Sequence, residues 1–120
     1  MATILVIEDN PANLKLAEFL LRKAGHEVLK AEDALAGIEL ARSAQPDLVL
    51  MDVQLPGMDG LAATRLLKSD PVMRATKVIA LTAFAMKGDE DKMLAAGGDG
   101  YLAKPYQYQQ LLDAVRAALS

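Results

Sequence analysis

The sequence predicts an α/β fold built on a parallel five-stranded sheet, and two observations lead to this prediction. Short apolar runs alternate with segments of helical spacing, which is the pattern of repeated βα units. The clearest runs are residues 4–7, 48–51, 78–81 and 101–103, and the residues that follow them are Glu8, Asp52, Thr82 and Lys104. A short apolar run bounded by polar residues is typical of a strand buried in a parallel sheet. These polar residues would therefore gather at the carboxyl ends of the strands, where open α/β sheets place their active sites.

The size and composition of the chain indicate a single domain. Its 120 residues, of which 52% are hydrophobic, suffice for one core. A net charge of −3 argues against a nucleic acid as the main partner, and the absence of cysteine excludes disulfides and thiolate zinc sites. We find no signal-peptide pattern and no apolar run near the roughly 20 residues of a membrane helix. We therefore expect a cytoplasmic protein without membrane insertion.

The first helix has clear end signals. After a strand at residues 3–7, Asn10 is the predicted N-cap and Pro11 the first helical residue. The apolar stripe of this helix comprises Leu14, Ala17, Leu21 and Ala24. Gly25 fits the left-handed position at its end, and His26, the only histidine, is expected at the surface. Residues 27–30 then form a weak strand, predicted to lie at an edge of the sheet.

The second helix is predicted to begin near Asp33 and to end at Gln45-Pro46, since the residue before a proline avoids helical backbone. Its buried residues would be Ala34, Ile38 and Ala41. The third strand runs into Asp52, and residues 55–60 form a loop rich in helix breakers.

The second half of the chain continues the alternation. The third helix closes at Asp70-Pro71, and the last helix carries an apolar set of Leu111, Leu112, Val115 and Leu119. Between them we predict a strand at 77–81, a helix at 87–96 and a strand at 101–103. Five strands and five helices use up the chain, so no output domain is expected.

Glu8-Asp9, Asp52, Thr82 and Lys104-Pro105, in this order at successive strand ends, resemble the receiver domain of two-component response regulators. The resemblance covers the whole chain, and residues 81–89 further resemble the DivK type of single-domain receiver. It implies a flavodoxin-like fold with strand order 2-1-3-4-5. It also implies a place in a phosphorelay, in which a histidine kinase or a histidine phosphotransfer protein phosphorylates an aspartate.

On this resemblance Asp52 is the phosphoacceptor, because a carboxylate can attack a phosphoryl group and hold it as an acyl phosphate. Glu8 and Asp9 would stand beside it, and two carboxylates about 4 Å apart repel by roughly 4 kcal/mol at an effective dielectric of 20. A hard divalent cation can offset this repulsion. The resemblance assigns Mg²⁺ to Asp9, Asp52 and the backbone carbonyl of Gln54, with Glu8 reached through water.

The same resemblance supplies a switch. Lys104 would pair with Asp52 at rest and with the phosphoryl group afterwards, and its bond to Pro105 is a candidate cis peptide. The Thr82 hydroxyl and the backbone N–H of Ala83 would bind phosphoryl oxygens. Tyr101 would then turn inward and remodel the face formed by the fourth helix, the fifth strand and the fifth helix, where a protein effector would bind. Ordinary packing roles for Thr82 and Tyr101 remain alternatives.

Two other functions would require residues that this chain does not have. A Mg²⁺-dependent phosphatase with an aspartyl nucleophile requires a second aspartate two residues after Asp52, where the chain has Gln54. A flavodoxin-type cofactor binder requires a Ser/Thr/Gly-rich loop after the first strand, where Glu8-Asp9 would repel a phosphate. A receiver used only as a scaffold, or one excised from a larger regulator or hybrid kinase, also remains open.

Overall fold

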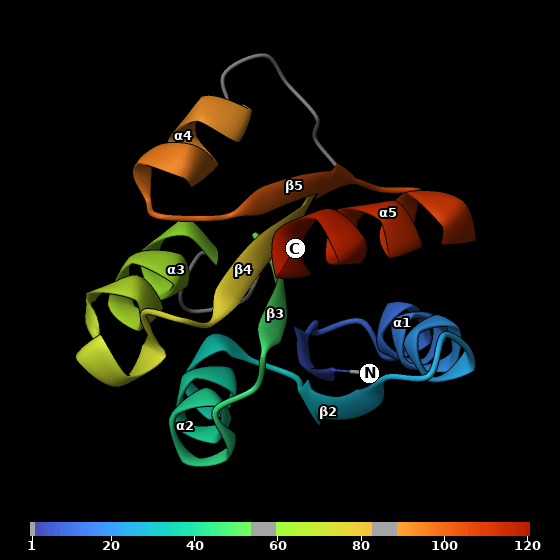
Figure 1. Ribbon diagram of the computed structural model, residues 1–120, viewed down its shortest axis with the longest axis horizontal. Helices are drawn as coiled ribbons and strands as arrows, with labels where there is room; N and C mark the ends of the chain where they lie inside the picture. The colour runs from blue at the N-terminus through green and yellow to red at the C-terminus, as the bar shows by residue number, and fades with distance from the viewer. Residues whose placement is uncertain (1, 54–59, 83–88) are drawn as a thin grey trace.

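The computed structural model describes residues 2–53, 60–82 and 89–120, which form strands alternating with helices (Figure 1). In chain order the elements are β1 Thr3–Ile7, α1 Pro11–Lys23, β2 Glu27–Ala31, α2 Ala34–Ala44, β3 Leu48–Asp52, α3 Gly60–Ser69, the 3₁₀ helix η1 Pro71–Met73, β4 Lys77–Thr82, α4 Asp89–Ala95, β5 Gly100–Ala103 and α5 Tyr108–Leu119. The strands form one parallel sheet in the order β2-β1-β3-β4-β5. The predicted flavodoxin-like topology is confirmed. None of the described helices is long and apolar enough to span a membrane.

Helices cover both faces of the sheet, and the strands alternate their side chains between two buried clusters (Figure 1). On one face, Leu14 and Leu21 of α1 and Val115 of α5 pack against strand residues such as Leu50. On the other face lie α2 and α3, and α4 lies beside β5. This burial on both faces explains why the central strands read as continuous apolar runs.

The predicted helix ends are largely confirmed. The Asn10 side chain accepts hydrogen bonds from the backbone N–H groups of Ala12 and Asn13, and the Asp33 side chain accepts from that of Ala36. Gly25 follows the end of α1 with φ of +94°, and Gln45 ends α2 with φ of 48°. The start of the predicted fourth helix, residues 87–88, lies outside the described residues, and the described part begins at Asp89.

The structure adds two details that the prediction did not include. In α5 the buried apolar residue of the last turn is Ala118, whereas Leu119 is 36% exposed. Each residue turns the helix by about 100°, so residue 118 lies within about 20° of the direction of the buried Leu111, whereas residue 119 lies about 80° from it. The turn after α3 also contains η1, which was not predicted: the Asp70 side chain caps it at Val72 and it buries Met73.

Gly60, the first residue of α3, packs directly against the end of β3. A Cβ atom there would lie 2.5 Å from the Cα of Val53 and 2.6 Å from the carbonyl oxygen of Asp52, both backbone atoms that cannot move aside cheaply. We expect Gly60→Ala to lower the free energy of unfolding by about 1–3 kcal/mol, measured by urea denaturation. The control is Gly100→Ala, whose Cβ would meet only the Ile79 side chain, at 3.2 Å. An equal loss in both variants would contradict the backbone clash.

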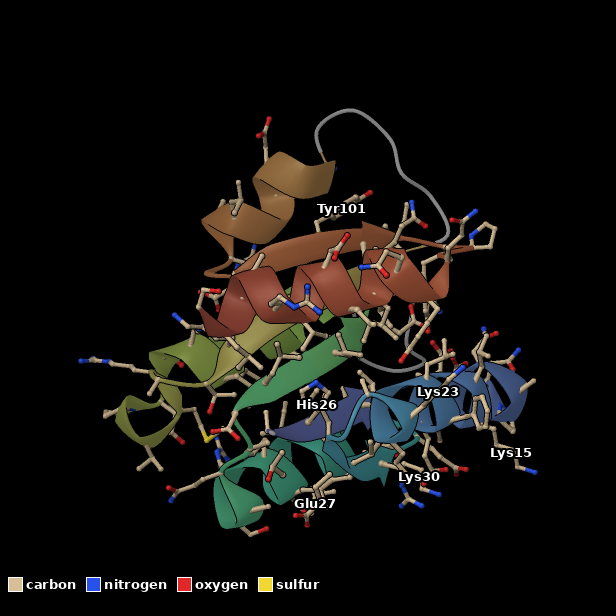
Figure 2. The ribbon with its side chains drawn as sticks, turned by 45° about the vertical axis from the view of Figure 1, so that its right-hand side comes forward. Lys15, Lys23, His26, Glu27, Lys30 and Tyr101 are labelled. Atoms are coloured by element: carbon tan, nitrogen blue, oxygen red, sulfur yellow. The ribbon has the colours of Figure 1, made fainter. Side chains whose placement is uncertain are left out.

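His26, labelled in Figure 2, is half-buried rather than fully at the surface. Its Nδ1 accepts a hydrogen bond of 3.1 Å from the backbone N–H of Ala2. Burial lowers the pKa of His26 below its ordinary value of 6.5. As the pH falls through about 6.5, the His26 imidazole is therefore protonated more readily in the unfolded chain than in the folded protein, which favours unfolding. We expect the free energy of unfolding to decrease from pH 7.5 toward pH 5, with a smaller decrease in His26→Gln. An unchanged pH dependence in that variant would assign the effect to other groups.

Candidate functional site

The sheet register brings the predicted polar residues to one edge. Ile7 pairs with Met51, Asp52 with Leu81, and Thr82 with Ala103, so the four strands end together. Backbone hydrogen bonds continue this alignment past the strand ends: the N–H of Lys104 donates to the carbonyl of Thr82 at 2.7 Å, and that of Glu8 to Ala31 at 3.0 Å. The side chains of Glu8, Asp52 and Lys104 are therefore positioned by the rigid sheet.

Three carboxylates meet at this edge. Each of Glu8, Asp9 and Asp52 offers an oxygen within 4.8 Å of the others. Glu8 is 2% exposed and Asp52 3% exposed, whereas Asp9 lies at the surface. Burying like charges this closely is unfavourable unless a cation compensates them.

Lys104 supplies one compensating charge. Its Nζ lies 2.6 Å from Oε2 of Glu8 and 3.2 Å from Oδ2 of Asp52. The contact with Asp52 is the one expected from the sequence, whereas the shorter bridge to Glu8 was not predicted. Glu8 also accepts a hydrogen bond of 3.2 Å from the backbone N–H of Asn10 through its other oxygen, Oε1.

Burial and mutual repulsion set the protonation behaviour of this cluster. Burial raises the pKa of Glu8, and the neighbouring Asp52 raises it further, although the hydrogen bond from Lys104 works in the opposite direction. For Lys104, burial works against the charged form, but the hydrogen bond to Glu8 and the charges of both acids outweigh it and raise its pKa. Lys104 therefore remains a cation at neutral pH.

The remaining predicted residues divide into two groups. Thr82 is buried at the end of β4. Tyr101 of β5, labelled in Figure 2, is half-buried and packs against the core cluster that includes α2 and α3. The Lys104–Pro105 peptide bond is cis. Gln54 and Ala83, predicted to contribute a carbonyl and an N–H, lie outside the described residues.

A cavity of about 420 Å³ adjoins Glu8 and Lys104, and sequence reasoning did not identify it. Its apolar lining comprises Val6, Leu16, Ala17, Leu81, Pro105 and Tyr106. Burial raises the pKa of the Tyr106 phenol. Tyr106, the aromatic residue directly after Lys104-Pro105, was the one local signal in the sequence that could have indicated this cavity.

The donor set fits a hard divalent cation. Among the described residues, three carboxylates share this edge and one ammonium contacts two of them, so negative charge is in excess there. Carboxylate oxygen is the ligand type that Mg²⁺ prefers. Asp9, which is exposed, and Asp52 are the side chains best suited to hold such an ion.

Comparisons with known proteins agree with this geometry. Residues 4–116 match the family described as response regulator receiver domain. The polar-differentiation response regulator DivK of Brucella anthropi is 39% identical over 117 residues, covering 98% of this chain and 95% of the relative. Among solved structures, the chain is similar to the receiver domain of the sensor histidine kinase PA1611 from Pseudomonas aeruginosa, with a TM-score of 0.90 and 36% identity. The match covers 98% of this chain and 97% of the PA1611 domain, and that structure has a magnesium ion coordinated in its active-site cleft. The chemotaxis protein CheY4 of Vibrio cholerae has a TM-score of 0.94 and 26% identity, covering 99% of both chains.

Proposed function

Since this chain belongs to the response regulator receiver domain family, we propose that it is a phosphorylation-driven switch that accepts a phosphoryl group on Asp52. The observation that carries the proposal is the placement of Asp52: its buried carboxylate ends a central strand, 3.2 Å from the Lys104 ammonium and beside the acidic pair Glu8-Asp9. The phosphoryl donor would be a phosphohistidine of a histidine kinase or a histidine phosphotransfer protein. Because kinases draw this group from ATP, we expect the reaction in the cytoplasm.

The transfer is a displacement at phosphorus. An Asp52 oxygen forms the new P–O bond while the P–N bond of the phosphohistidine breaks, and the electron pair of that bond stays with the departing imidazole. The Lys104 ammonium is close enough to pair with the incoming phosphoryl oxygens, which is the positioning and charge neutralisation that phosphoryl transfer requires. Mg²⁺, held by Asp9 and Asp52 with a backbone carbonyl expected from Gln54, would supply further neutralisation.

The proposed output is protein–protein signalling by a single domain. Thr82 and the N–H of Ala83 would bind phosphoryl oxygens, and Tyr101 would move with Thr82 and alter the α4–β5–α5 face for a protein effector. The similarity to DivK favours a single-domain regulator. The similarity to the receiver of a sensor histidine kinase keeps a receiver within a larger protein as the second candidate.

Intact mass spectrometry tests the phosphoacceptor proposal. The purified chain is incubated with acetyl phosphate and Mg²⁺, and then again with a chelator in excess of the metal. We expect a gain of one phosphoryl group that the chelator abolishes. If the mass does not change with acetyl phosphate or with a panel of phosphorylated histidine kinases that label other receivers, the chain is a scaffold and the proposal is wrong.

The switch proposal predicts that Thr82→Ala keeps phosphorylation but weakens the response to it. A hydrogen bond to a charged group contributes about 1.5–3 kcal/mol, so its loss reduces the switched population roughly 10- to 150-fold relative to the resting one. The measurement is the NMR change of β5 amides and the Tyr101 ring on phosphorylation, with Thr82→Ser, which keeps the hydroxyl, as the matched control. A full response in Thr82→Ala would remove Thr82 from the switch.

A further inference from the structure

A groove of about 490 Å³ lies between the end of α1 and the length of α5. Figure 1 shows α5 between α4 and α1, and the groove is on the α1 side. Its apolar lining consists of Ala24, which follows α1, and of Leu112, Val115 and Leu119 of α5. The groove is therefore separate from the proposed output face, which α5 shares with α4.

The helix α5 carries more apolar surface than the core covers. Its residues in the buried cluster are Leu111, Val115 and Ala118. Beside them Leu112 is only half-buried and Leu119 is 36% exposed. Tyr108, Leu112, Val115 and Leu119 follow one another at spacings of four, three and four residues, which is the spacing of the seam along which two helices pack. This second stripe indicates a seat for another helix.

The rim of the groove is positively charged. Arg116 lines it, and at its other end the Lys23 ammonium lies 5.2 Å from the centre of the Tyr108 ring. Among the described residues neither cation takes part in an ion pair, and no aspartate or glutamate lines the groove. The one acid of α5, Asp113, accepts a hydrogen bond from Gln109 instead. A chain of net charge −3 thus places two uncompensated cations beside an apolar groove.

We propose that the groove between α1 and α5 binds an acidic amphipathic helix of a partner protein. Apolar side chains of that helix would cover Leu112 and Leu119, and its carboxylates would pair with Lys23 and Arg116. The 12 residues of α5 span roughly 17 Å, so about three turns of the partner make contact. A long apolar stripe with a cation toward each end matches the regularly spaced anchors of a helix rather than a compact ligand.

The position of the groove separates this inference from the proposed function. His26, which also lines the groove, directly precedes β2 and is labelled together with Lys23 in Figure 2. Because β2 and β3 both run parallel to β1, this end of the groove lies at the edge of the sheet opposite to Asp52. Binding there does not depend on whether Asp52 accepts a phosphoryl group.

The first test uses a synthetic peptide of about 18 residues, long enough to form a helix in water. It carries leucine at the a and d positions of a heptad repeat, glutamate beside them and alanine elsewhere. In NMR titrations of the parent protein we expect saturable shifts of the His26 imidazole and of the Leu112 and Leu119 methyl groups. The absence of saturable shifts at millimolar peptide, or shifts centred on another surface, would overturn the proposal.

The second test exchanges charges between the two partners. The double variant Lys23→Glu with Arg116→Glu should bind the glutamate peptide about tenfold more weakly than the parent does, because two ion pairs are lost. The same variant should prefer a peptide with lysine in place of glutamate. Unchanged affinity for the glutamate peptide would show that the rim does not select an acidic partner.

The apolar floor is tested with Leu119→Asp, a change at the exposed end of α5 that the core should tolerate. This variant should also weaken binding about tenfold. The matched controls are Leu66→Asp, at a residue of α3 that is 43% exposed, and Arg74→Glu, at the exposed residue after η1. Both should bind the glutamate peptide like the parent, and equal losses in these controls would contradict the proposed site.

Two other occupants give different results. Sedimentation of the parent without peptide should show a monomer, and a dimer that Leu119→Asp disperses would assign the groove to a second copy of the chain. Decanoate, an anion with a single apolar tail, should produce smaller shifts than the peptide. Binding of decanoate as tight as that of the peptide would assign the groove to a small amphiphilic anion and overturn the proposal.

Discussion

Asp52→Asn is expected to abolish the gain of a phosphoryl group from acetyl phosphate. An amide oxygen is a far weaker nucleophile than a carboxylate, and Asp9 and Glu8, the neighbouring acids, follow a different strand. The fold should survive, because Lys104 keeps its shorter contact with Glu8 and one of three crowded negative charges is removed. We therefore expect Asp52→Asn to lose labelling completely. Its unfolding midpoint should be no lower than that of the parent.

The matched control for this change is Asp70→Asn. Asp70 caps η1 and pairs with Arg42 at 3.0 Å, and asparagine can keep the cap. This variant should be labelled like the parent. Labelling that persists in Asp52→Asn would show that the phosphoryl group resides on another side chain, and peptide mapping would locate it.

Lys104→Met is expected to destabilise the metal-free protein more than any other substitution considered. The change keeps the length of the side chain but leaves the carboxylates of Glu8 and Asp52, which are 2% and 3% exposed, without their shared cation. Removing one partner of a buried ion pair costs about 3–5 kcal/mol. The measurement is the free energy of unfolding from urea denaturation in the presence of a chelator.

The same variant should also be labelled slowly by acetyl phosphate when Mg²⁺ is present. The lost hydrogen bond to a charged phosphoryl oxygen corresponds to a rate roughly 10- to 150-fold lower. Lys68→Met is the matched control: its bridge to Asp99 is more exposed, so it should lose less stability and keep the labelling rate. Equal losses of stability in the two variants would mean that Lys104 has no special part in holding the buried acids.

Much of the fold was predictable because its signals are local. The Asn10-Pro11 helix start depends on neighbouring residues alone, and the buried run ending at Asp52 is read directly from side-chain polarity. Where the structure adds a detail that the sequence did not predict, a three-dimensional choice was involved. At the end of α5, Ala118 and Leu119 are both apolar, and only the position of the helix over the sheet decides that the smaller one is buried.

The same distinction between local sequence signals and three-dimensional packing holds for the candidate site. The sequence by itself determined which residues end the strands and hence which side chains could meet, because parallel strands share one carboxyl edge. Only the tertiary structure decided that Lys104 lies closer to Glu8 than to Asp52, and that Gly60 packs on the carbonyl of Asp52. The physical reason is one of scale: differences of a few tenths of an ångström select among the partners of a buried charge. Distances of that size exist only after residues far apart in the chain have been brought together by the packing of the sheet.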